Sequence, residues 1–88
     1  MEMKIKINHN ESIMVEQLLM LANSYKNIIH WMEQNQSETS LIKKYIHNLR
    51  YIEETLNNYK NTLCIKYQVP QGASYYILFD TEEISFED

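Results

Sequence analysis

The 88-residue chain carries a net charge of −4, with 44% hydrophobic and 23% charged residues but only one Gly, one Pro and one Cys. A chain of this length forms one small domain with a thin core, which dimerisation would strengthen. A single Gly excludes the usual phosphate-binding loops and nucleophile elbows, and a single Cys excludes an internal disulfide and a multi-cysteine zinc site. We therefore expect a globular protein with long regular elements and no cofactor.

The sequence also bears on origin and location. Asn, Ile, Lys and Tyr are plentiful, and their AT-rich codons indicate a low-GC bacterium, phage or plasmid. The first residues, MEMKIKIN, lack the apolar core of a secretory signal. The most apolar stretch, IMVEQLLMLA, is interrupted by Glu16 and is far shorter than a membrane span. We expect a cytoplasmic protein without a membrane contact.

The strict alternation of MEMKIKI predicts a strand over residues 2–7. Asn8 and Glu11 then have the spacing of a capping box, which predicts the start of a helix over residues 10–35. Steps of four and three define an apolar seam along this helix, made of Met14, Leu18, Leu21, Tyr25, Ile28 and Met32. Val15, Leu19, Ala22 and Ile29 form a second stripe beside it, and Ile13, Met20 and Trp31 widen the apolar arc. A helix with so broad an apolar side should contact more than one neighbouring element.

The polar segment QNQSETS predicts a link, with Ser37 or Thr39 capping a second helix over residues 39–64. Its seam has the same spacing and comprises Ile42, Tyr45, Leu49, Ile52, Leu56, Tyr59 and Leu63. Two long helices joined by a short link fold back as an antiparallel hairpin.

The remaining residues predict strands at 75–79 and 84–86 with DTEE as their turn, whereas residues 65–69 fit either helix or strand. We therefore predict an α+β fold, in which the helical hairpin packs on a small antiparallel sheet formed by the N-terminal strand and the C-terminal hairpin. An all-α hairpin dimer is the alternative.

The chain ends in an acidic cluster without any Lys or Arg, called here the acidic end: Asp80, Glu82, Glu83, Glu87 and Asp88. These carboxylates could dock on a basic protein surface or imitate a nucleic-acid backbone. They could equally promote solubility and protect an exposed strand edge.

A basic stripe lies near the start of the second predicted helix and consists of Lys43, Lys44, His47 and Arg50. It could read DNA as part of a dimeric regulator, or it could contact the acidic end of the same chain or of a second copy. The overall acidity disfavours nucleic-acid binding and favours a solvated helix face.

The sequence contains little that supports metal binding or catalysis. His30, Glu33 and His47 could hold a metal across the hairpin, but the repeated Glu-x-x-His motif of helical metal sites is missing. Cys64 lies between Leu63 and Ile65, as a small buried hydrophobe would. No catalytic constellation is present, so we do not expect an enzyme and place no residue in a catalytic or metal site.

The leading hypothesis is a non-enzymatic regulator, an inhibitor or adaptor, that binds another protein. Its candidate binding residues are the acidic end and the apolar helix surface that includes Met20 and Trp31. A homodimer is a further expectation, because surplus apolar surface on so small a chain is readily covered by a second copy.

Overall fold

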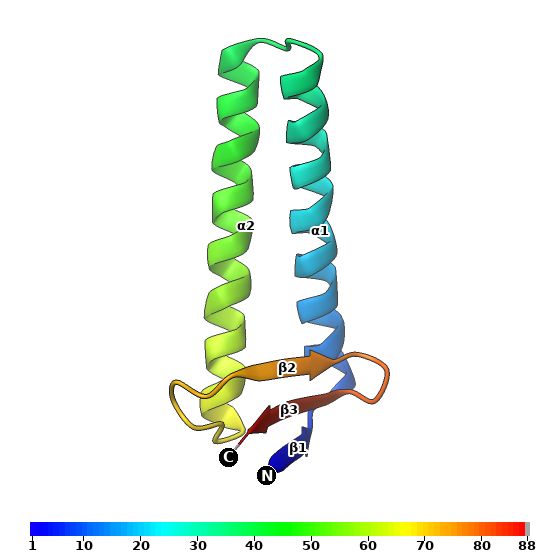
Figure 1. The fold of residues 1–88 in the computed structure, drawn as a ribbon, viewed down its shortest axis with the longest axis vertical. Helices are drawn as coiled ribbons and strands as arrows, with labels where there is room; N and C mark the ends of the chain where they lie inside the picture. Colours follow the sequence, from blue (N-terminus) through cyan, green and yellow to red (C-terminus); the bar gives the residue numbers. More distant parts are fainter. Residues whose placement is uncertain (88) are drawn as a thin grey trace.

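The computed structural model describes residues 1–87 and contains two helices and three strands in the order β1 (Glu2–Lys6), α1 (His9–Gln34), α2 (Thr39–Lys66), β2 (Tyr75–Leu78) and β3 (Glu83–Glu87). The helices form a long antiparallel hairpin, and the sheet crosses its base (Figure 1). The predicted α+β fold is thereby confirmed. The all-α alternative is wrong, because the three predicted strand regions form one sheet with β3 at its centre.

The start of α1 follows a local sequence signal, whereas the start and the end of α2 differ from the prediction. Asn8 and Glu11 form the predicted capping box at the start of α1. At the start of α2 the N-cap is Glu38, so the prediction of Ser37 or Thr39 was wrong. Helix α2 continues through Lys66, two residues beyond its predicted end, and the strand interpretation of residues 65–69 is therefore wrong.

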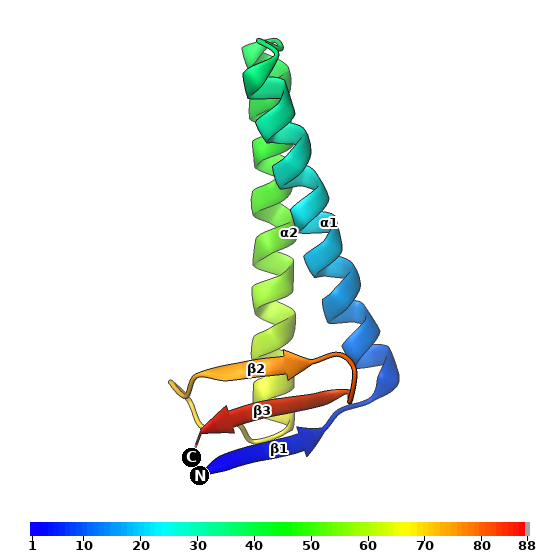
Figure 2. The ribbon, with the colours of Figure 1, turned by 45° about the vertical axis from the view of Figure 1, so that its right-hand side comes forward.

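The sheet has the order β1–β3–β2 and is antiparallel throughout. The central strand β3 places Ile84 opposite both Ile5 and Ile77. Seen from the side, the strands run across the lower ends of both helices, and the far end of the hairpin projects away from them (Figure 2). The protein measures 49 × 24 × 21 Å as a result.

The main core lies at the base, where the sheet covers the helix ends. Ile84, Val15 and Leu63 are 0%, 1% and 2% exposed. The same cluster contains Ile7, Leu56, Val69 and Phe86. Away from the sheet, burial is confined to the seam between the two helices, which holds Ala22, Ile29, Met32 and Ile52.

Helix α1 is rotated relative to the seam predicted from its sequence. Met14, Leu21 and Ile28 were expected between the helices but remain 44%, 45% and 43% exposed. The neighbouring stripe with Ala22, only 2% exposed, faces α2, together with Tyr25 and Met32 of the predicted seam. A small side chain at this position lets two helices approach closely, which favours this rotation over one that opposes larger side chains.

Neither helix, over the residues described, has an apolar segment long enough to cross a bilayer.

Candidate interaction surface

The side of α1 that points away from α2 is apolar and uncharged. We call it the outer face, and it comprises Ile13, Met14, Gln17, Met20, Leu21, Ser24, Ile28 and Trp31. These positions are separated mainly by three, four and seven residues and therefore share one broad side of the helix. Helix geometry thus gathers scattered apolar residues into a surface about five turns long.

The two most exposed apolar members of the outer face are Met20 at 61% and Trp31 at 63%. Ser24 lies among them, and its hydroxyl donates a hydrogen bond to the Met20 carbonyl oxygen at 3.0 Å. Because this hydroxyl already has a partner within the helix, covering it would leave no donor unsatisfied. Gln17 is the other polar member of the outer face, and its side-chain amide would need a hydrogen-bond partner on burial.

The outward side of α2 has the opposite character. The basic stripe of Lys43, Lys44, His47 and Arg50 is exposed there, and among residues 1–87 none of these side chains forms an ion pair. The stripe lies toward the tip of the hairpin, whereas the strands and their acidic turn lie at its base (Figure 1). The suggestion that the stripe contacts the acidic end of its own chain is therefore wrong.

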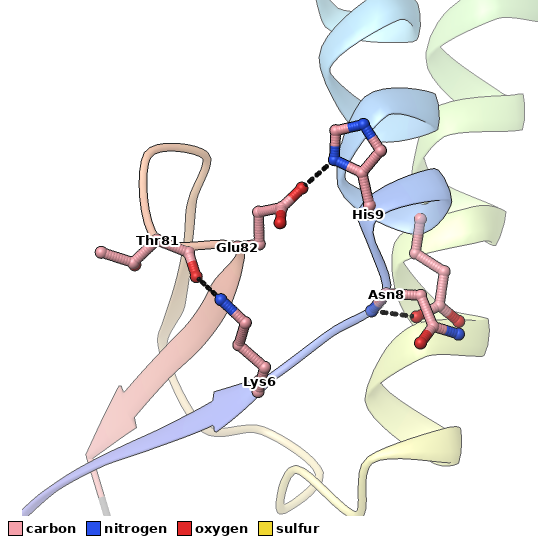
Figure 3. A network of polar contacts seen from close by, with 6 residues as sticks. Lys6, Asn8, His9, Thr81 and Glu82 are labelled. Carbon is pink, nitrogen blue, oxygen red and sulfur yellow. Dashed lines mark hydrogen bonds and ion pairs between the residues drawn. The ribbon is translucent and has the colours of Figure 1, made fainter.

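The acidic turn between β2 and β3 is bound to the start of the chain (Figure 3). Glu82 contacts the Nδ1 atom of His9 at the first residue of α1. Lys6 Nζ donates to the Thr81 carbonyl oxygen at 2.6 Å, and the Ile7 amide donates to that of Glu82 at 2.9 Å. These contacts give this part of the acidic end a role within the fold.

The other acidic residues differ in their surroundings. Glu83 is half-buried and pairs in register with Lys6, while Glu87 lies 3.5 Å from the Met1 amino nitrogen. Asp80 is exposed at the turn, and within residues 1–87 it has no ion-pair partner. Asp88 lies outside the described residues. Among the described carboxylates of the acidic end, Asp80 is thus the most available to a partner.

A polar network joins the start of α1 to the end of α2. The Glu11 carboxylate accepts hydrogen bonds from Lys66 Nζ at 2.7 Å, from the Tyr67 hydroxyl and from the Asn8 amide at 2.9 Å. Burial alone would raise the pKa of Glu11, but these hydrogen bonds outweigh it and hold the pKa below its ordinary value. The same contact raises the pKa of Lys66 and of Tyr67. A carboxylate held ionised in this way serves as a structural clamp rather than as a general base.

The histidines proposed as metal ligands do not form part of a metal-binding cluster. His30 and His47 are both exposed, and no cluster of three or more His, Cys, Asp or Glu side chains in the described part of the chain could hold a metal ion. The arrangement of His30, Glu33 and His47 required by that hypothesis does not form.

An open pocket of about 400 Å³ lies between the end of α2 and the loop that leads into β2, with Cys64, Val69 and Tyr75 in its wall. Burial, together with the neighbouring Cys64 thiol, raises the pKa of Tyr75. The remaining lining residues are Asn61, Ile65, Pro70, Gln71, Gly72 and Ala73, so the wall carries no charged side chain. None of these lining residues is a His, Asp, Glu or Lys of the kind that lowers the pKa of a reactive thiol.

Comparisons with protein-family models, with curated proteins and with solved structures found no match to this chain. The outer face of α1 is therefore the main indication of function.

Sequence reasoning singled out Met20 and Trp31 but assigned Met14, Leu21 and Ile28 to the helix seam. One signal could have identified all five: no charged residue lies on that side of α1 between residues 13 and 31. An exposed helix face normally carries charges, so their absence over five turns marks this side of α1 as a candidate interaction surface.

Proposed function

We propose that the protein is a non-enzymatic protein-binding module that acts through the outer face of α1, as a small inhibitor or adaptor of a low-GC bacterium, phage or plasmid. The observation that supports this proposal most strongly is the continuous uncharged surface with Met20 and Trp31 at its most exposed points. Exposed Trp and Met side chains are characteristic of the centre of protein interfaces, where charged side chains are depleted.

The flanks of the outer face favour a protein over a lipid surface. Helices that lie in a membrane interface present many Lys and Arg residues beside their apolar side. Helix α1 contains one Lys and no Arg. This residue, Lys26, lies beside Glu53 and is thereby directed toward α2. The acidic Glu16 borders the outer face instead, and it would be repelled by anionic lipids.

Capture from a low-GC bacterial lysate, followed by quantitative mass spectrometry, tests the proposal. The bait is the full chain in three forms: wild type, Met20→Glu on the outer face, and Tyr51→Glu at a position of α2 that is 69% exposed. A functional partner is enriched by wild type and by Tyr51→Glu but at least about tenfold less by Met20→Glu, because the charge has no partner in the interface. Equal enrichment by all three forms, or none in repeated trials, would count against the proposal.

The acidic end is tested separately with Asp80→Asn. Deleting residues 80–88 would not serve, because it removes β3 from the centre of the sheet. If Asp80 steers the partner electrostatically, this variant slows association without changing the fold.

A dimeric nucleic-acid-binding regulator is the second candidate, and the observation in its favour is the exposed basic stripe. A mobility shift with duplex DNA at low salt, lost in the double variant Lys43→Gln, Lys44→Gln, would support it. No shift at about 50 mM salt would exclude it, since contacts with phosphates are strongest under that condition.

A further inference from the structure

We propose that the outer face of α1 is covered by a second copy of this chain, packed side by side and antiparallel so that the two α1 helices lie against each other. The inference rests on the protein-binding part of the proposed function, because it names the protein that binds the same face. Three properties of the described chain support a second copy: its surface area, the symmetry of the outer face and the distribution of charge along the hairpin.

The first property is the area left uncovered. The accessible surface is 6563 Å², whereas a compact monomer of 10.6 kDa exposes about 5,500 Å². The surplus of about 1,000 Å² matches the roughly 800 Å² that each partner contributes to a standard stable interface. The projecting hairpin is the source of the surplus, and a second hairpin alongside would remove it.

The second property is self-complementarity. A two-fold interface brings one patch against an identical patch, so the patch must tolerate its own reversal. The outer face has large apolar residues at both ends, Ile13 and Met14 at one and Ile28 and Trp31 at the other. Ser24 lies near the middle. In an antiparallel pair centred close to Ala22, the apolar ends meet each other and the small residue lies near the crossing.

The third property is charge. The far half of the hairpin, residues 22–52, carries four basic and two acidic residues, while the rest of the chain carries four basic and ten acidic residues. The molecule therefore has a positive tip and a negative base. An antiparallel copy places the tip of each chain beside the base of the other, whereas a parallel copy places like charges together.

The geometry is consistent with this pairing. From Ala22, α1 extends about 20 Å to its first residue, His9, and about 18 Å to its last, Gln34. An axis at the level of Ala22 therefore brings the tip of one hairpin level with the sheet of the other.

Sedimentation equilibrium of the purified full chain provides the main test. We expect wild type and Tyr51→Glu to be dimeric at micromolar concentration, and Met20→Glu to raise the dissociation constant at least about 100-fold by burying two unpaired carboxylates. Circular dichroism checks that Met20→Glu remains helical, and Met20→Gln replaces it if it does not. A monomeric wild type at about 500 μM, or equal dimerisation of Met20→Glu and Tyr51→Glu, would overturn the inference.

Cross-linking determines the orientation. In a Cys64→Ala background, Ser24→Cys near the axis should cross-link to its own copy through a short bismaleimide. Trp31→Cys should not cross-link to itself, because position 31 of one chain lies about 27 Å from position 31 of the other along antiparallel helices. A mixture of Ile13→Cys and Trp31→Cys should give the mixed product. Self-linking of Trp31→Cys would show a parallel dimer and contradict the proposed arrangement.

The salt dependence provides an independent readout. Raising NaCl from 50 to 500 mM should weaken the antiparallel dimer about three- to tenfold, because the opposite ends of the two copies attract one another. A dimer strengthened by salt would contradict the charge pairing.

These outcomes separate the inference from the function that underlies it. A monomeric wild type that still captures a foreign protein through Met20 overturns the dimer and retains the binding module. A dimer that captures no foreign protein retains the inference and overturns the role as a regulator of another protein.

Discussion

The base of the molecule and the far half of its hairpin are stabilised in different ways. At the base, a three-stranded sheet covers the ends of both helices and buries Ile84, Val15 and Leu63 almost completely. In the far half, each helix has only the other as a neighbour, and burial reaches Ala22, Ile29, Met32 and Ile52 along one seam. Tyr25 and Tyr45 add an aromatic contact there, with ring centroids 5.6 Å apart.

This difference indicates what each region requires. The base has two layers of secondary structure around one core, which is the minimum for an independent domain. Two helices alone provide a single layer, and the apolar residues on their outer sides stay exposed. The far half therefore gains most from a partner, and the outer face begins at the base and extends into the far half.

The largest expected effect is the loss of a buried side chain from the base. Ile84→Ala removes a side chain with no exposed surface and should lower the free energy of unfolding by about 3–5 kcal/mol, because the cavity is enclosed by both layers. Ile29→Ala in the far half should cost about 2 kcal/mol, since the two helices can close around the smaller residue. Urea denaturation at a fixed protein concentration measures both.

Tyr76→Ala is the control for Ile84→Ala. Tyr76 is on β2 and is 72% exposed, so its removal should cost less than about 1 kcal/mol. If Ile29→Ala costs as much as Ile84→Ala, the far half is packed as tightly as the base and the contrast between them fails.

The second prediction concerns the clamp of the base. The pKa of Glu11 is held below its ordinary value of 4.5, so the folded chain binds this proton at lower pH than the unfolded chain does. The stabilisation is fully present above pH 4.5 and is lost as the pH falls through the folded pKa. Glu11→Gln should cost about 1–2 kcal/mol at pH 7, because the hydrogen bonds to a charged acceptor are lost. The difference from wild type should shrink below pH 4.5.

Unfolding curves from pH 7 to pH 3 test this prediction, with Glu16→Gln as the matched control. Glu16 is on the same helix and is exposed, so its substitution should change the stability by less than about 0.5 kcal/mol. A constant difference between Glu11→Gln and wild type over the whole pH range would show that ionisation of Glu11 does not stabilise the fold.

The elements of the fold differ in how far the sequence predicts them. The strand over residues 2–7, the capping box of Asn8 and Glu11, and the helical hairpin each depend on spacing over a few residues, and the structure contains all three. The end of α2 could not be predicted in this way, because Lys66 and Tyr67 interact with Glu11, more than fifty residues away. Local periodicity carries no information about such a contact.

The rotation of α1 was unpredictable for a related reason. The helix is apolar around more than half of its circumference, so periodicity alone offers two neighbouring stripes as the seam. The small side chain of Ala22 lets α2 approach closely, so the stripe that contains it is the one buried. This choice depends on the shape of a second helix. The candidate surface followed from this choice, because Met14, Leu21 and Ile28 joined the outer face only when the other stripe was buried.

The smallest expected effect is that of the ion pair between the two helices at the border of the far half. Lys26 Nζ lies 3.7 Å from Glu53 Oε2, and the side chains are 54% and 44% exposed. Water and salt screen such a pair, so a double-mutant cycle of Lys26→Met and Glu53→Gln should give a coupling free energy below about 0.5 kcal/mol. A coupling above about 1 kcal/mol would mean that electrostatics holds the helices together. A small value would leave the stability of the far half to the apolar seam between the helices.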